Sequence, residues 1–66
     1  MGQKETQRQI LRLPTVKGKV GLGRTKIYEL ISQGLFPAPQ PIAGSRAVGW
    51  DSLAVQAWID QQLDAQ

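Results

Sequence analysis

The side chains best suited to chemistry in this sequence are cations, and they are gathered rather than spread. Four of them lie within ten residues that contain no acid: Lys17, Lys19, Arg24 and Lys26. Arg46 is the only base that follows them. Residues 1–46 have a net charge of +6, whereas residues 47–66 hold three aspartates and no base, a net charge of −3. This asymmetry indicates that one end of the molecule binds a polyanion while the other end faces solvent.

Catalysis and metal binding have little support in the composition. The chain of 66 residues has no cysteine and no histidine, so it lacks the commonest metal ligands and the commonest general base. A pocket for a cofactor would consume most of the core of so small a domain. We therefore expect no enzymatic activity, metal, cofactor or small-molecule substrate.

One segment, residues 18–25, resembles the nucleotide-binding pattern G-x-x-x-x-G-K-[ST], with Arg24 in place of the lysine. Such a loop follows a strand and opens a helix within a parallel sheet. In this sequence a helical pattern precedes the loop, and the chain has no room for the sheet. We therefore interpret the glycines as a turn between two helices.

Two short helices are expected on either side of that turn. Pro14 suits the first turn of a helix, and Val16 and Val20 share one face of it. The second helix starts at Gly23 or Arg24, and its apolar face follows the i, i+3, i+4 pattern: Ile27, Leu30 and Ile31. Gly34 is expected to end this helix in a left-handed conformation. Two helices joined by a short glycine-containing turn are typical of a helix-turn-helix.

The rest of the chain predicts a small β-hairpin and one more helix. Prolines 37, 39 and 41 favour an extended segment that is not a central strand. The hairpin is expected over residues 42–50, with strands at 42–43 and 47–50 around the turn Gly44-Ser45-Arg46. Asp51 is a suitable N-cap for the last helix. The apolar side chains expected on one face of that helix are Val55, Trp58, Ile59 and, one turn later, Leu63.

The fold predicted from these patterns is mainly α with a small β-hairpin, in a single domain over residues 10–66. Trp50 and Trp58 are expected to anchor its core. Residues 1–9 read as a flexible N-terminal arm. They also match the myristoylation pattern M-G-x-x-x-[ST], although so loose a pattern often occurs by chance and a plain tail is the simpler interpretation. The longest apolar runs have two or three residues, so we expect no membrane span and a cytoplasmic location.

The exposed face of the second helix holds the candidate binding residues. In a helix-turn-helix the start of the second helix enters the major groove of DNA, and basic side chains pair with phosphate or guanine. Glu29 on this face repels phosphate, so we expect it to pair with Lys26, although contact with a cytosine is an alternative. Arg46, at the hairpin tip, is placed to reach an adjacent groove. The candidates on the helix are Arg24, Thr25, Lys26, Tyr28 and Ser32.

Five pieces of the sequence, in order, resemble the AlpA family of prophage transcriptional regulators. They are RLP at 12–14, GLGRTKIYELI at 21–31, FPAP at 36–39, GSRAVGW at 44–50 and VQAWI at 55–59. This family is similar to MerR-like and excisionase-like winged helix-turn-helix domains. The resemblance implies a bacterial, nucleoid-associated protein with a recognition helix at about 24–34 in the major groove and a wing in the neighbouring groove.

Carried over by position, the resemblance makes Arg24, Thr25, Lys26 and Tyr28 the recognition-helix contacts and Arg46 the wing contact. Lys17 and Lys19 become phosphate contacts on the supporting helix. The sequence departs from the family at Gly23, where a serine is usual, and at Glu29, where an arginine is frequent. Site preference is therefore expected to differ from that of relatives.

Three functions remain open on this reading. The first is sequence-specific binding of double-stranded DNA to regulate transcription in a prophage or genomic island. The second is excisionase-like bending of DNA, with neighbouring copies and an integrase or recombinase as partners. The third is a protein-binding adaptor that uses the basic face.

Overall fold

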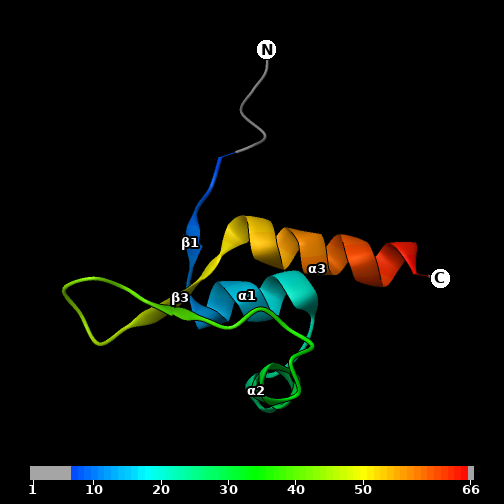
Figure 1. Cartoon of the computed structure of the whole chain (residues 1–66), viewed down its shortest axis with the longest axis horizontal. Coiled ribbons are helices and arrows are strands. Elements are labelled where there is room, and N and C mark those ends of the chain that lie inside the picture. The colour runs from blue at the N-terminus through cyan, green and yellow to red at the C-terminus, as the bar shows by residue number, and fades with distance from the viewer. Residues whose placement is uncertain (1–6, 66) are drawn as a thin grey trace.

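Three helices and a small antiparallel sheet make up the computed structural model of the chain, which describes residues 7–65 (Figure 1). The elements follow the order β1 (Ile10–Leu11), α1 (Leu13–Val20), α2 (Arg24–Ser32), β2 (Gln40–Pro41), β3 (Val48–Asp51) and α3 (Ser52–Asp64). This arrangement confirms the mainly α fold with a small hairpin, a winged helix-turn-helix in which α1 and α2 are the helix pair and the β2–β3 hairpin is the wing.

The turn between α1 and α2 forms as the glycine pattern predicts. Helix α1 carries Pro14 in its first turn and ends at Gly21, whose φ is 72° and whose N–H donates to the carbonyl of Lys17 at 2.8 Å. Helix α2 begins after Gly23, which has no side chain to cap it. The short turn therefore brings the two helices together in the helix-turn-helix.

Gly34 terminates α2 in a left-handed conformation with φ of 73°. The N–H of Leu35 donates to the carbonyl of Leu30 at 2.8 Å, and that of Gly34 donates to the carbonyl of Ile31 at 3.0 Å. This pair of bonds is the Schellman arrangement, which satisfies carbonyls at a helix end and favours glycine at the left-handed position. The end of α2 is thus fixed by local chemistry, as expected.

The hairpin starts two residues earlier than the sequence indicated. Its first strand is Gln40–Pro41, which pairs with Gly49 and Val48, whereas we expected a strand at residues 42–43. Pro41 is tolerated because β2 is an edge strand, where a missing N–H need not leave a partner unpaired. The loop between the strands is closed by Ile42, whose N–H donates to the carbonyl of Ala47 at 2.9 Å.

A third strand, β1, was not expected from the sequence. Ile10 pairs with Asp51 and Leu11 pairs with Trp50, so the strand order is β1-β3-β2 and β3 is central. In addition, the N–H of Ser52 donates to the carbonyl of Gln9 at 2.9 Å, which extends the contact by one residue. The start of the domain is therefore attached directly to the strand that leaves the wing.

The core draws one buried side chain from each element except β2, and one more from the segment between α2 and β2. Its buried members are Leu11, Val16, Ile27, Phe36, Trp50 and Val55. Complete burial of an aliphatic side chain stabilises a fold by about 1.5–3 kcal/mol, so such residues dominate the stability of a domain this small. Trp50 is 1% exposed, as predicted for a core anchor, whereas Trp58 is only half-buried.

Two tryptophans hold the segment that connects α2 to the hairpin. The indole N–H of Trp58 donates to the carbonyl of Leu35 at 2.8 Å, and that of Trp50 donates to the carbonyl of Pro37 at 2.9 Å. Phe36, between those carbonyls, packs edge-on against Trp58 with 4.9 Å between ring centres. This proline-rich segment is therefore fixed to α3 and β3 without belonging to a helix or a strand.

Helix α3 begins as expected and continues past the core. The Asp51 carboxylate accepts from the N–H of Leu53 at 2.9 Å and so caps the helix. Val55 is buried, but Leu63, which we placed on the same apolar face, is 68% exposed. The last turn of α3 therefore extends beyond the residues that could cover this face.

Most of the expected N-terminal arm, including the myristoylation pattern, lies outside the described residues. Its last two residues make contacts that the sequence did not indicate: Arg8 pairs with Asp51, and the N–H of Gln9 donates to the hydroxyl of Ser52 at 2.8 Å. The division into an arm at 1–9 and a domain at 10–66 stays a prediction. Within residues 7–65, no helix is both long enough and apolar enough to cross a membrane.

Candidate nucleic-acid interface

The outward face of α2 is polar, as its sequence pattern requires. Ile27 points into the core with no exposed surface, and Leu30 and Ile31 are half-buried beside it. The exposed side chains of the helix are Arg24, Thr25, Lys26, Tyr28, Glu29 and Ser32. The helix therefore presents all five of its candidate binding residues to solvent, together with one acid.

Arg24 and Tyr28 are brought together on this face. The guanidinium carbon of Arg24 lies 5.7 Å from the centre of the Tyr28 ring, within the range of a cation–π interaction. Tyr28 in turn meets Trp50 edge-on, with 6.2 Å between ring centres and 71° between ring planes. Because Trp50 belongs to β3, these contacts connect the start of α2 to the strand that leaves the wing.

Lys26 pairs with the one acid of the helix. Its ammonium lies 3.7 Å from a carboxylate oxygen of Glu29, and both side chains are about half exposed. The pairing of Glu29 with Lys26 that the sequence favoured is therefore confirmed. An exposed pair of this kind adds little stability, but it gives Lys26 a competing partner for its charge.

Ser32 and Thr25 differ in what their hydroxyls do. The Ser32 hydroxyl donates to the carbonyl of Glu29 at 2.7 Å, so its proton is committed to the helix backbone. Thr25, in the first turn of α2, is exposed. Phosphate oxygens accept hydrogen bonds, so Thr25 is the better placed of the two hydroxyls to donate to a polyanion.

The other candidate cations lie on separate elements. Lys17 and Lys19 are exposed in the last turn of α1, and Arg46 is exposed in the loop of the hairpin, which projects away from the helices (Figure 1). Arg12, which the sequence reading did not select, is exposed at the N-cap of α1. Among residues 7–65, none of these four cations forms an ion pair. Their charges are therefore uncommitted within the described part of the chain.

Unlike these four cations, Arg8 forms an ion pair. Its guanidinium donates twice to one carboxylate oxygen of Asp51, at 2.8 and 3.0 Å. This bond, together with the N–H of Leu53, holds the pKa of Asp51 below its ordinary value, while the carboxylate raises the pKa of Arg8. Asp51 thus links Arg8, two residues before β1, to the start of α3.

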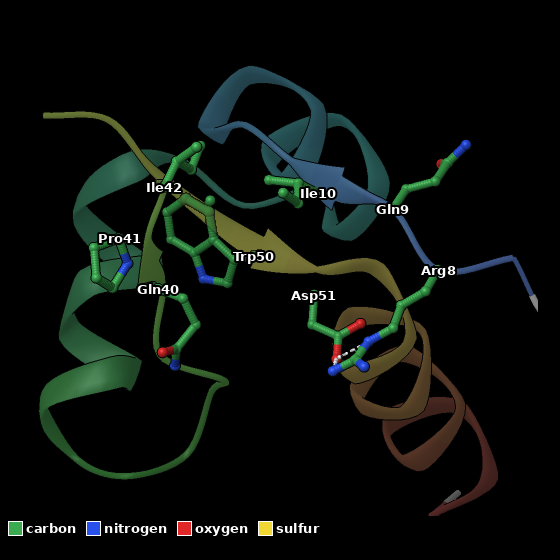
Figure 2. A pocket seen from close by; sticks show the side chains of 9 residues that line it. Arg8, Gln9, Ile10, Gln40, Pro41, Ile42, Trp50 and Asp51 are labelled. Carbon is green, nitrogen blue, oxygen red and sulfur yellow. Dashed lines mark hydrogen bonds and ion pairs between the residues drawn. The ribbon is translucent and has the colours of Figure 1, made fainter. Parts of the chain in front are cut away.

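A groove of about 300 Å³ crosses the outer face of the sheet beside this pair (Figure 2). Ile10 and Ile42 flank it, and Gly49 lies between them with no side chain. A Cβ at position 49 would collide with the Cγ2 atom of Ile10 and lie 3.2 Å from the carbonyl oxygen of Leu11. Glycine is therefore favoured here by close approach rather than by backbone conformation.

Comparison with known proteins agrees with this architecture. Residues 9–63 match the family described as "Prophage CP4-57 regulatory protein (AlpA)". The chain is 46% identical over 54 residues to the "Uncharacterized protein ORF88" of Enterobacteria phage P4, a match that covers 82% of this chain and 60% of the phage protein.

A second relative is the "DNA-binding transcriptional activator AlpA" of Escherichia coli (strain K12). It is 32% identical over 60 residues, which cover 82% of this chain and 84% of that protein. No solved structure matches the chain. Because the family match extends from the residue before β1 to the last turn of α3, we conclude that the chain belongs to the AlpA family of prophage regulatory proteins.

Proposed function

We propose that the chain is a sequence-specific regulator that binds double-stranded DNA. In this proposal the start of α2 lies in the major groove, and the wing around residues 42–50 reaches the adjacent groove. The observation that carries it is the match to AlpA of Escherichia coli, a protein described as a DNA-binding transcriptional activator. That match covers both helices of the pair and the wing.

The distribution of charge supports the choice of face. Apart from Arg24, the cations with no ion-pair partner among residues 7–65 lie on α1, at its N-cap and in the wing loop, which are the elements that precede and follow α2 along the chain. Helix α3 carries aspartates and no base, so phosphates would repel it. Arg24 and Thr25 occupy the first turn of α2, the part of a recognition helix that contacts base edges. In the proposal, Lys17, Lys19 and Arg46 contact the DNA backbone.

Selection from a random duplex library tests this function directly. The wild-type protein is expected to enrich one family of sequences and to bind it more tightly than random duplex at the same salt concentration. Arg24→Gln is expected to reduce affinity for the enriched duplex by about 1–3 kcal/mol if the guanidinium reads a base. Failure to enrich any sequence would refute specific recognition.

Salt dependence tests the backbone contacts. Lys17→Gln and Arg46→Gln should each weaken binding evenly across sequences and reduce the slope of log K against log salt by about one. Arg8→Gln is the matched control, since it removes the same charge from a side chain that is paired with Asp51. An equal change of slope in all three variants would show that total charge, rather than this face, governs binding.

A further inference from the structure

We propose that Tyr28 is a positioning residue that orients Arg24 for DNA and sets its place relative to the wing. This inference rests on the function proposed above. It differs from a direct role of Tyr28 at the DNA, because the ring would act through the guanidinium that it supports.

Helix stability does not explain an arginine at the start of α2. A helix N-terminus carries partial positive charge, so a cation there is disfavoured, and the first turn of α2 contains no acid. Within residues 7–65, Arg24 has no carboxylate partner. Its contact among the described residues is the face of Tyr28, four positions later on the same helix face. The aromatic ring is therefore what orients the guanidinium.

The ring of Tyr28 is itself held by a buried neighbour. Trp50 is 1% exposed, and its indole N–H is bonded to the carbonyl of Pro37, so it is fixed from two sides. Tyr28 meets this indole edge-on, an arrangement that aromatic pairs prefer, and keeps 37% of its surface exposed. The tyrosine ring is thus held by Trp50 while it also contacts the guanidinium of Arg24.

This chain of contacts links two parts of the proposed interface. Trp50 is two residues along β3 from Val48, which pairs with β2 at the base of the wing. The start of α2 is therefore connected, through Tyr28 and Trp50, to the strand that forms one side of the wing. An arginine held before binding loses less conformational freedom on the DNA, so orientation by Tyr28 should raise affinity for the preferred sequence.

Affinity for the enriched duplex tests this role through a double-mutant cycle. Tyr28→Phe keeps the ring and is expected to bind within about twofold of wild type, whereas Tyr28→Leu should bind about two- to fivefold more weakly, the range of an exposed cation–π contact. In an Arg24→Gln background, Tyr28→Leu should cost nothing further. A purely structural role would not produce this dependence on Arg24.

Two results would overturn the proposal. If Tyr28→Phe binds as weakly as Tyr28→Leu, the hydroxyl contacts the DNA itself. If Tyr28→Leu costs the same with and without Arg24, the two residues act independently. Should Tyr28→Leu not fold, Arg24→Lys provides the second variant, because it keeps the charge and removes the planar guanidinium. If Arg24→Lys binds the enriched duplex as tightly as wild type, a guanidinium oriented by the ring is not needed and the proposal fails.

Proton NMR of the free protein separates this proposal from the function on which it rests. Stacking predicts that the Arg24 Hδ protons are shifted upfield by the tyrosine ring in wild type and in Tyr28→Phe, and return to ordinary values in Tyr28→Leu. Absence of that shift refutes the orientation of Arg24 even if the protein selects a DNA sequence. If the upfield shift of the Arg24 Hδ protons is present but the protein selects no DNA sequence, the DNA function is refuted instead. The role of Tyr28 at DNA then fails with it.

Discussion

Gly49→Ala should destabilise the domain through one added methyl group. The new Cβ would collide with Cγ2 of Ile10 and approach Cδ1 of Ile42 at 3.3 Å, so both sides of the outer groove must move. Overpacking costs about 1–3 kcal/mol, whereas alanine in a strand ordinarily gains about 0.5–1 kcal/mol over glycine. The net loss is about 1 kcal/mol, which for a domain of this size lowers Tm by about 4–8 °C.

Thermal unfolding followed by circular dichroism measures this loss, with Gly18→Ala as the matched control. Gly18 lies within α1 and a Cβ there meets no atom within 4 Å, so the control should raise stability by about 0.5–1 kcal/mol. Ile10→Ala should reduce the penalty at position 49, because it removes the colliding methyl. A Gly49→Ala protein that melts at or above the wild-type temperature would refute the packing argument.

Three further predictions concern charge and hydrogen bonding. Glu29→Gln removes the partner of Lys26 and should raise affinity for random duplex and steepen the salt dependence by about one, as measured by fluorescence anisotropy. Ser32→Ala should leave DNA affinity unchanged, because the hydroxyl proton is already donated to the helix backbone. Asp51→Asn keeps a cap but loses the ion pair with Arg8. The pKa of Asp51 in the folded protein lies below its ordinary value of 3.8, so the ion pair with Arg8 should stabilise wild type fully above pH 3.8. That contribution to the free energy of unfolding should be lost as the pH falls through the lowered pKa. Asp51→Asn should lack this acid-sensitive step.

Each of these predictions has a control or a contrary outcome in the same assay. Asp60→Asn makes the same charge change as Glu29→Gln but lies on α3, so an equal rise in affinity would assign the effect to net charge. A loss of affinity in Ser32→Ala would restore the direct contact that the sequence suggested. Identical pH profiles of Tm in wild type and Asp51→Asn would show that the pair with Arg8 is not maintained in solution.

The parts of the fold that local chemistry determines were predictable from the sequence. The end of α2 at Gly34 and the cap at Asp51 each depend on a few neighbouring residues, so short patterns predict them. Strand β1 was missed because its pairing joins residues about forty positions apart, and the dipeptide Ile10–Leu11 has no periodicity of its own. The start of the hairpin was misplaced because Pro41 was assigned to the extended proline segment before the hairpin, although an edge strand tolerates a proline.

The same division holds for the candidate interface. Helical periodicity correctly gave the exposed face of α2 and the spacing between Lys26 and Glu29. It could not reveal that Tyr28 rests on Trp50, because that contact joins a helix to a strand across the fold. Nor could it separate Arg8, which is paired, from the uncommitted Arg46. The partner of Arg8 is Asp51, which is distant in the sequence and is brought close only by the pairing of β1 with β3.

The two indole bonds that hold the segment after α2 make that segment observable. The chain contains only two tryptophans, so a proton spectrum has two indole N–H signals, and each is bonded to a carbonyl of this segment. The Trp50 signal reports on its attachment to β3 and the Trp58 signal on its attachment to α3. Their hydrogen-exchange rates would show separately whether a ligand tightens the connection on the wing side or on the side of the last helix.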